Sequence, residues 1–163
     1  MKRSCALLFI LCLLLSFAVF GEGTYERIDM NMTRAELDAL FAGCEEGEYV
    51  AYGDALCAFY ESGRLKAKMR RFEDVRGLAP LTEGSFDRVR GLKYGTRIDE
   101  LSELLGEGLE IMLMNLSDDE ESGCRKLLCW QDSSGSVMEA LFELDDGKWI
   151  LFALGEVKSE EAK

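Results

Sequence analysis

Two short segments with the same spacing of leucines recur 64 residues apart, and they constrain the fold more than any other feature of the chain. Residues 36–41 read E-L-D-A-L-F, and residues 100–105 read E-L-S-E-L-L. Apolar side chains at positions i, i+3 and i+4 form the buried stripe of a short amphipathic helix. Thr33 and Thr96 each precede a carboxylate by three residues, the spacing at which a hydroxyl caps a helix start and the carboxylate bonds back. The sequence therefore predicts two similar helices, one in each half.

Each predicted helix follows a short aromatic-led segment, 25–28 or 86–89, and precedes strands that close on a tight hairpin. The turns contain Ser62-Gly63 in one half and Asp146-Gly147 in the other, and such dipeptides favour two-residue hairpin loops. With about three strands in the first half and four in the second, we expect an α+β fold. It consists of two tandem helix-helix-antiparallel-sheet repeats, with helices covering one face of the sheet and the other face open.

The expected organisation has five parts. They are a signal peptide (1–21), a first repeat (22–76), a linker (77–84) that contains the only proline, a second repeat (85–157) and a charged tail (158–163).

The first segment has the features of a secretory signal peptide. Lys2 and Arg3 precede an apolar run over residues 5–20, and Val19 and Gly21 supply the small residues of a cleavage site. We therefore predict cleavage after Gly21 and a secreted, extracellular or periplasmic protein. A retained anchor is the alternative, although the apolar run is shorter than the ~20 residues that span a bilayer. Cleavage would lower the net charge from −12 to −14, because both basic residues are lost.

Four of the six cysteines would remain after cleavage, and an oxidising compartment favours disulfides. Cys44 and Cys57 form the pair that is easiest to join, from a loop after the helix to a nearby strand. Cys124 and Cys129 would lie on opposite faces of a straight strand, about 16 Å apart, so a bond between them needs a turn or bulge. Four unpaired buried thiols are the remaining alternative.

The composition excludes several kinds of chemistry. The chain has no histidine, which removes the commonest general base and the imidazole ligands of zinc. Its 31 acidic and 19 basic residues argue against nucleic acid as a partner, because binding a polyanion depends on neutralising phosphates. The acidic segment 118–121 lacks the alternating ligand spacing of a calcium loop. We expect no cofactor or metal, no nucleic acid and, after signal cleavage, no membrane association.

This order of elements resembles the SmpA/OmlA (BamE-like) and β-lactamase-inhibitor-like (BLIP-like) tandem-repeat superfamily. Residues 31–41 match its G-M-T-x-x-E-[V/L]-x-x-[L/F]-[L/F]-G helix motif with Asn31 in place of glycine, and residues 94–106 match with one extra residue before Glu100. The resemblance covers nearly all of residues 25–155. It implies a protein that binds other proteins, because known members inhibit β-lactamases or, as lipoproteins, help to assemble the envelope. This chain lacks the lipidated cysteine of the lipoproteins.

Strand alternation assigns side chains to the two faces of the sheet, given turns in which Tyr60 faces Leu65 and Leu144 faces Trp149. One face is almost wholly apolar, and we expect the helices to cover it. The other carries charged side chains such as Lys68 and Glu139, whose burial without partners would cost several kcal/mol. If Trp130 opposes Val137, Trp130 joins this open face. The predicted binding surface comprises Phe59, Arg64, Lys66, Lys68, Arg70, Leu128, Trp130, Leu141, Ile150 and Phe152.

Aromatic and aliphatic groups among charges are typical of a protein-binding surface, and the basic residues between Arg64 and Arg70 would steer an acidic partner. We therefore expect a secreted, non-enzymatic protein-binding module. Its narrower forms are an inhibitor of an extracellular enzyme such as a β-lactamase, or an envelope assembly or scaffold component. The partner is another protein, and a homodimer through the sheet face is an alternative. The rival class is a secreted carboxylate-dependent hydrolase, since the chain has 31 acidic residues, although no pair of them is singled out by apolar surroundings.

Overall fold

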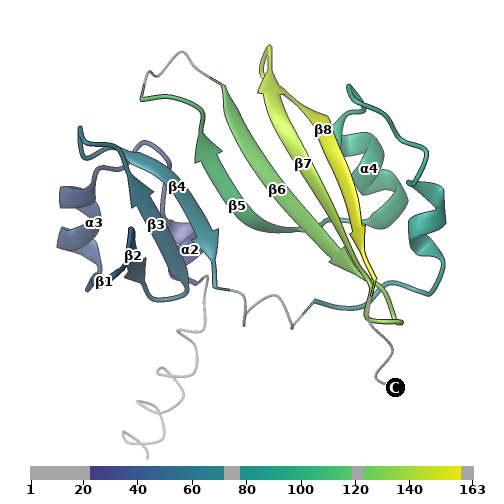
Figure 1. Ribbon diagram of the computed structural model, residues 1–163, viewed down its shortest axis with the longest axis horizontal. Coiled ribbons are helices and arrows are strands. Elements are labelled where there is room, and N and C mark those ends of the chain that lie inside the picture. The colour runs from purple at the N-terminus through teal and green to yellow at the C-terminus, as the bar shows by residue number, and fades with distance from the viewer. Residues whose placement is uncertain (1–22, 72–77, 119–122, 159–163) are drawn as a thin grey trace, which may run out of the picture.

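The computed structural model describes residues 23–71, 78–118 and 123–158, in which eight antiparallel strands form one continuous sheet. Each strand pairs with its neighbours in sequence, so the sheet is a simple meander (Figure 1). The strands are β1 (Cys44–Glu46), β2 (Tyr49–Tyr52), β3 (Ala55–Phe59), β4 (Leu65–Arg70), β5 (Leu109–Asn115), β6 (Cys124–Gln131), β7 (Val137–Asp145) and β8 (Lys148–Val157). The predicted signal peptide lies outside the described residues.

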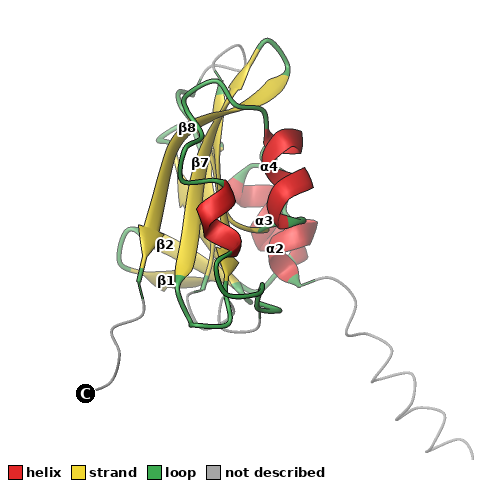
Figure 2. Cartoon of the chain, turned by 90° about the vertical axis from the view of Figure 1, so that its right-hand side faces the viewer, coloured by secondary structure: helices red, strands yellow, loops and turns green. Residues whose placement is uncertain are grey.

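The helices are short and lie on one side of this sheet. They are α2 (Thr24–Arg27), α3 (Arg34–Leu40), the 3-10 helix η2 (Ser85–Arg88) and α4 (Ile98–Leu105). Figure 2 shows α2, α3 and α4 together on one side of the strands, and no described helix covers the opposite side. We call that opposite side the open face.

The predicted fold of two helix-sheet repeats is wrong. The described residues contain a single eight-stranded sheet with three short α-helices, and four strands rather than three come from the first half. Strand β4 pairs with β5 through Ala67 with Met114, Lys68 with Leu113 and Met69 with Met112, so the sheet crosses the expected boundary between repeats. Two separate sheets would each expose an additional edge, and unpaired edge strands are an aggregation hazard. Pairing β4 with β5 removes both edges.

The two main helices begin in different ways. Helix α3 has the predicted cap: the Thr33 hydroxyl accepts from the Glu36 N–H at 3.3 Å, and the Glu36 carboxylate accepts from the Thr33 N–H at 2.8 Å. These bonds lower the pKa of Glu36. The predicted Thr96 cap of α4 is wrong, because the Thr96 hydroxyl donates to the Lys93 carbonyl instead. Helix α4 starts one residue later than predicted.

Two hydrophobic cores lie between the helices and the sheet. The first combines Tyr25 and Ile28 with residues from α3 and β2–β4, among them Leu37 and Leu65. The second combines Phe86 and Val89 with residues of α4 and β6–β8. Each half therefore buries its own apolar side chains, and the sheet joins the two.

Lys68 lies on the helix-covered side of β4, contrary to the prediction that its charge would keep it on the open face. Its side chain is 6% exposed, and its ammonium donates to the Tyr25 carbonyl at 3.1 Å and the Ile28 carbonyl at 2.8 Å. The ammonium also lies 4.3 Å from the centre of the Tyr25 ring. Carbonyls at the end of α2 and an aromatic face replace water around the charge, which is why its burial is tolerated. Burial still lowers the pKa of Lys68.

We expect Lys68→Met to lower the free energy of unfolding by about 1–3 kcal/mol, because it removes the ammonium that donates to the Tyr25 and Ile28 carbonyls. Lys66→Met is the matched control, since Lys66 is exposed and two residues away on the same strand. It should change the free energy by no more than about 0.5 kcal/mol. Urea denaturation of both variants measures this, and equal effects would contradict the described orientation of β4.

A groove on the open face of the sheet

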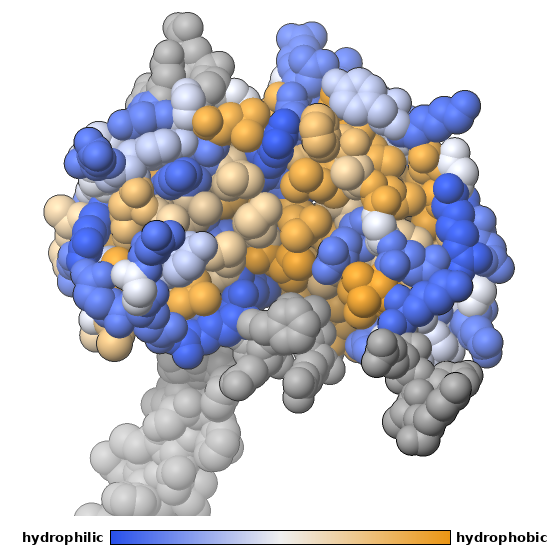
Figure 3. Space-filling model, viewed as in Figure 1, coloured by the Kyte–Doolittle hydropathy of each residue, from blue (hydrophilic) through white to orange (hydrophobic). Residues whose placement is uncertain are grey.

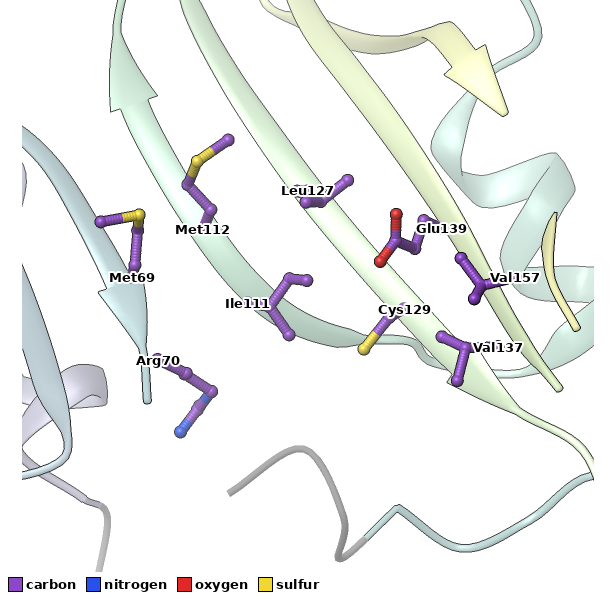
Figure 4. A pocket seen from close by; sticks show the side chains of 9 residues that line it. All are labelled: Met69, Arg70, Ile111, Met112, Leu127, Cys129, Val137, Glu139 and Val157. Carbon is purple, nitrogen blue, oxygen red and sulfur yellow. The ribbon is translucent and has the colours of Figure 1, made fainter. Parts of the chain in front are cut away.

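The open face carries an apolar groove of about 470 Å³ that crosses five strands. It is lined by Met69 and Arg70 of β4, Ile111 and Met112 of β5, Leu127 and Cys129 of β6, Val137 and Glu139 of β7, and Val157 of β8 (Figure 4). A space-filling view from this side shows hydrophobic side chains gathered over the middle of the sheet (Figure 3). Pockets of this size accept small ligands or side chains of a partner.

The register of the central strands produces the groove. Met69 and Met112 are directly paired across β4 and β5, and directly paired residues share a face. A bulge in β5 between Glu110 and Met112 adds Ile111 as an extra residue. The bulge lets Ile111 and Met112 both line the groove, although alternation would send neighbours to opposite faces.

The two charged residues that line the groove differ in their hydrogen-bond and ion-pair partners. Arg70 is 11% exposed; its Nε donates to the Glu110 carbonyl at 2.8 Å, and its guanidinium pairs with Glu26 and Asp54. Glu139 is half-buried, and no described residue forms an ion pair or hydrogen bond with it. Burial, and secondly the Glu139 carboxylate, raises the pKa of the Cys129 thiol to about 11. That thiol is therefore protonated at neutral pH and is a poor nucleophile or metal ligand.

Three of the predicted binding residues lie on the open face, outside the groove. Leu141 and Ile150 are half-buried there, and Phe152 is 43% exposed. The Phe152 ring meets Tyr94 edge-on at 6.2 Å, and the Arg125 guanidinium lies 4.3 Å from its centre. Tyr94 was not predicted. Backbone hydrogen bonds between β8 and residues 95–96 bring it beside Phe152.

Leu128 and Trp130 lie in the second core, on the helix-covered side, and not on the predicted surface. They are 6% and 3% exposed, and the Trp130 indole donates to the Gly106 carbonyl at 3.1 Å. The assumed pairing of Trp130 with Val137 is wrong, because Trp130 pairs with Met138. A shift of one residue in register moves a side chain to the other face of the sheet. The Asp132 carboxylate, which accepts from the backbone of Ser134 and Ser136, fixes the turn that sets this register.

The predicted basic stripe of the first half is not assembled. Lys68 turns toward the helices, and Phe59 packs against the first core. Arg70 lines the groove, but its guanidinium pairs with Glu26 and Asp54. The Arg64 guanidinium donates to the Asp118 carbonyl at 2.7 Å, which leaves Lys66 as the exposed member of the set. The assumed pairing of Tyr60 with Leu65 is wrong, because Phe59 pairs with Leu65 and the register shifts between Ala58 and Phe59. Leu65 therefore lies in the first core, whereas Ala67 and Met69 lie on the open face. That side continues the face of Met112 and Met114 on β5.

The four described cysteines are unpaired. Cys44 pairs with Ala51 and Cys57 with Val50, and these two neighbours on β2 point to opposite faces. Cys44 and Cys57 therefore lie two strands apart and on different faces, so the pairing that was considered easiest is not formed. Cys124 and Cys129 share β6, which has no bulge against β7, and this places them on opposite faces as the sequence suggested.

No protein-family model matches the chain, and no curated protein matches it. Among the described residues, no group of three or more cysteine and carboxylate side chains is placed to hold a metal ion. No described helix has the length and apolar character to cross a membrane.

We expect Trp130→Ala to lower the free energy of unfolding by about 3–5 kcal/mol, because it leaves a large cavity in the second core. Phe152→Ala should lower it by less than about 1 kcal/mol, since the ring is partly exposed. Urea denaturation of the two variants compares them. Similar losses would contradict the register of β6 and β7.

Peptide mapping without reduction should yield no peptide that joins Cys44 to Cys57, even after air oxidation of the folded protein. In the same sample, iodoacetamide at neutral pH should modify exposed Cys44 long before buried Cys57 and Cys129, whose pKa values burial raises to about 12 and about 11. Mass spectrometry follows both reactions. A Cys44–Cys57 peptide would contradict the pairing of β1 and β3 with the two edges of β2.

Proposed function

We propose that this protein is a non-enzymatic protein-binding module and that the groove on the open face is where its partner binds. The observation that carries this proposal is the groove itself: about 470 Å³ of largely apolar space across β4–β8, on the side that no described helix covers. Concave, mostly apolar sites with a few polar groups are where proteins commonly bind other molecules.

The residues of the groove suit recognition of another protein. Met69 and Met112 are flexible and polarizable, so they adapt to the shape of a partner. The nearby cluster of Phe152, Tyr94 and Arg125 supplies aromatic and guanidinium groups, the types that contribute most to binding energy at interfaces. Together they give an apolar centre and a mixed edge, the usual arrangement of a protein interface.

The same lining gives little support to a carboxylate-dependent hydrolase. That chemistry uses a pair of carboxylates across the scissile bond, whereas Glu139 is the one carboxylate among the groove's nine lining residues. The Cys129 thiol beside it is kept protonated by burial. The arrangement therefore favours binding over catalysis.

Two narrower forms of the proposal rest on the family resemblance of the sequence and remain predictions. One is inhibition of an extracellular enzyme such as a β-lactamase, and the other is a role in envelope assembly or scaffolding. Secretion through the N-terminal segment is likewise a prediction.

Leu127→Arg tests the proposal, because it places a charge at the centre of the groove. Wild type and variant are immobilised, and the proteins that each retains from the native extracellular fraction are quantified by mass spectrometry. We expect the variant to lose its specific partner by roughly thirtyfold, the effect of removing a central contact worth about 2 kcal/mol.

Leu40→Arg is the control, since Leu40 is 59% exposed on α3 and lies away from the open face. It should retain the partner as the wild type does. If folded Leu127→Arg retains every protein that the wild type retains, the groove is not the binding site and the proposal fails.

A further inference from the structure

Glu139 stands at the edge of the groove, and no described residue places a cation beside it. Its neighbours across the sheet are Cys129 on β6 and Gly155 on β8, neither of which is basic. The other charged residue of the groove, Arg70, has its guanidinium occupied by Glu26 and Asp54. Within the described part of the chain, the Glu139 carboxylate has no hydrogen-bond donor or ion-pair partner, although its side chain is half-buried.

A second carboxylate on the same face of β7, that of Glu143, is neutralised by a neighbouring arginine. It lies four residues further along β7, on the same face, and is directly paired with Arg125 on β6. The Arg125 guanidinium donates to one Glu143 oxygen through two nitrogens, at 2.8 and 3.1 Å. The corresponding position opposite Glu139 is a thiol. Glu143 is thus neutralised inside the protein, whereas Glu139 has no such partner among the described residues.

Gly155 keeps the approach to Glu139 open. It lies directly opposite Glu139, its backbone does not have the positive φ that favours glycine, and an added Cβ would meet no atom within 4 Å. Neither the chain conformation nor packing therefore requires glycine, which is destabilising relative to alanine inside a strand. A glycine in such a position marks a place where another molecule comes close to the sheet.

Resting on the function proposed above, we infer that the partner segment presents a lysine or arginine flanked by apolar residues. The cation pairs with Glu139 beside Gly155, and the apolar side chains occupy the groove over Ile111, Met112 and Leu127. A partner without the cation would bury the carboxylate unpaired and bind more weakly, so the charge pair acts mainly as a selector.

The charge of the whole chain supports the same partner. A net charge of −12 attracts basic segments and repels acidic ones. It also disfavours a second copy of this chain as the occupant, because the two copies would repel and each would bring its own Glu139 to the interface. A basic, apolar segment satisfies both the groove and the carboxylate.

Selection from a random peptide library displayed on phage tests the inference without assuming a partner. Wild type should enrich peptides with Lys or Arg between apolar residues. Replacing that basic residue by norleucine in a synthetic copy should weaken binding to the wild type about tenfold. Selection on Glu139→Lys should enrich Asp or Glu in place of the basic residue. On Glu139→Gln the basic and norleucine peptides should bind equally.

Two further variants act as controls, and all are checked for folding by thermal unfolding. Glu143→Gln should keep the basic preference, because Glu143 is already paired with Arg125. Gly155→Val should weaken the selected basic peptide more than tenfold, because its side chain fills the approach to Glu139.

The outcomes separate this inference from the function on which it rests. Peptides that depend on Leu127 but show no basic preference, or the same preference on Glu139→Lys, overturn the inference and leave the binding function standing. If no enriched peptide is lost on Leu127→Arg, the binding function fails and the inference with it.

Discussion

The pairing of β4 with β5 is the constraint on which the rest of this structure depends. Each half of the chain has its own core, one around Tyr25 and Leu37 and the other around Phe86 and Leu101, and these cores share no buried residue. The halves become one sheet through only three directly paired positions. Without this junction, Met69 and Met112 would not lie side by side and the groove would lose one of its walls.

Polar contacts on the helix-covered side reinforce this short junction. The Tyr25 hydroxyl donates to Glu110 at 3.0 Å, and the Lys126 ammonium lies 2.9 Å from the other Glu110 oxygen. Glu110 therefore connects a helix residue of the first half to a strand of the second. At the far end, the Tyr60 hydroxyl donates to the Asn115 carbonyl and the Asn115 amide donates to the Leu65 carbonyl. These polar contacts between the halves lie on the helix-covered side. The side chains at the same junction on the open face, Met69 and Met112, are apolar.

Local signals in the sequence predicted local structure well. The Asp146-Gly147 turn was correct: both residues have positive φ, and Leu144 pairs with Trp149 as expected. The prediction of the Thr33 cap was also correct, and its partner Glu36 is only three residues away. These features depend on contacts within a few residues, which the order of amino acids specifies directly.

Features that depend on distant contacts could not be predicted in the same way. The side on which Lys68 lies is decided by two carbonyls some forty residues earlier, which satisfy a charge that alternation alone places in solvent. The face on which Trp130 lies depends on the length of the turn between β6 and β7, where one residue more or less reverses it. Hydrogen bonds from the backbone to Asp132 fix that turn, and the sequence alone does not reveal them. The groove was missed because its two walls belong to halves that were expected to form separate repeats. The one available signal was the segment 109–116, in which Glu110 is the only charged residue and apolar side chains fall on both faces of a strand.

The open face also has to avoid binding copies of itself, and the charge of the chain provides for this. An exposed apolar groove promotes association between copies of the protein. A net charge of −12 opposes this, because two copies repel each other, and it favours the approach of a basic partner. On the open face, Arg125 and Glu143 neutralise each other, whereas no described residue neutralises Glu139. The chain's acidity thus acts at long range on the encounter, and the Glu139 carboxylate acts at short range on the fit.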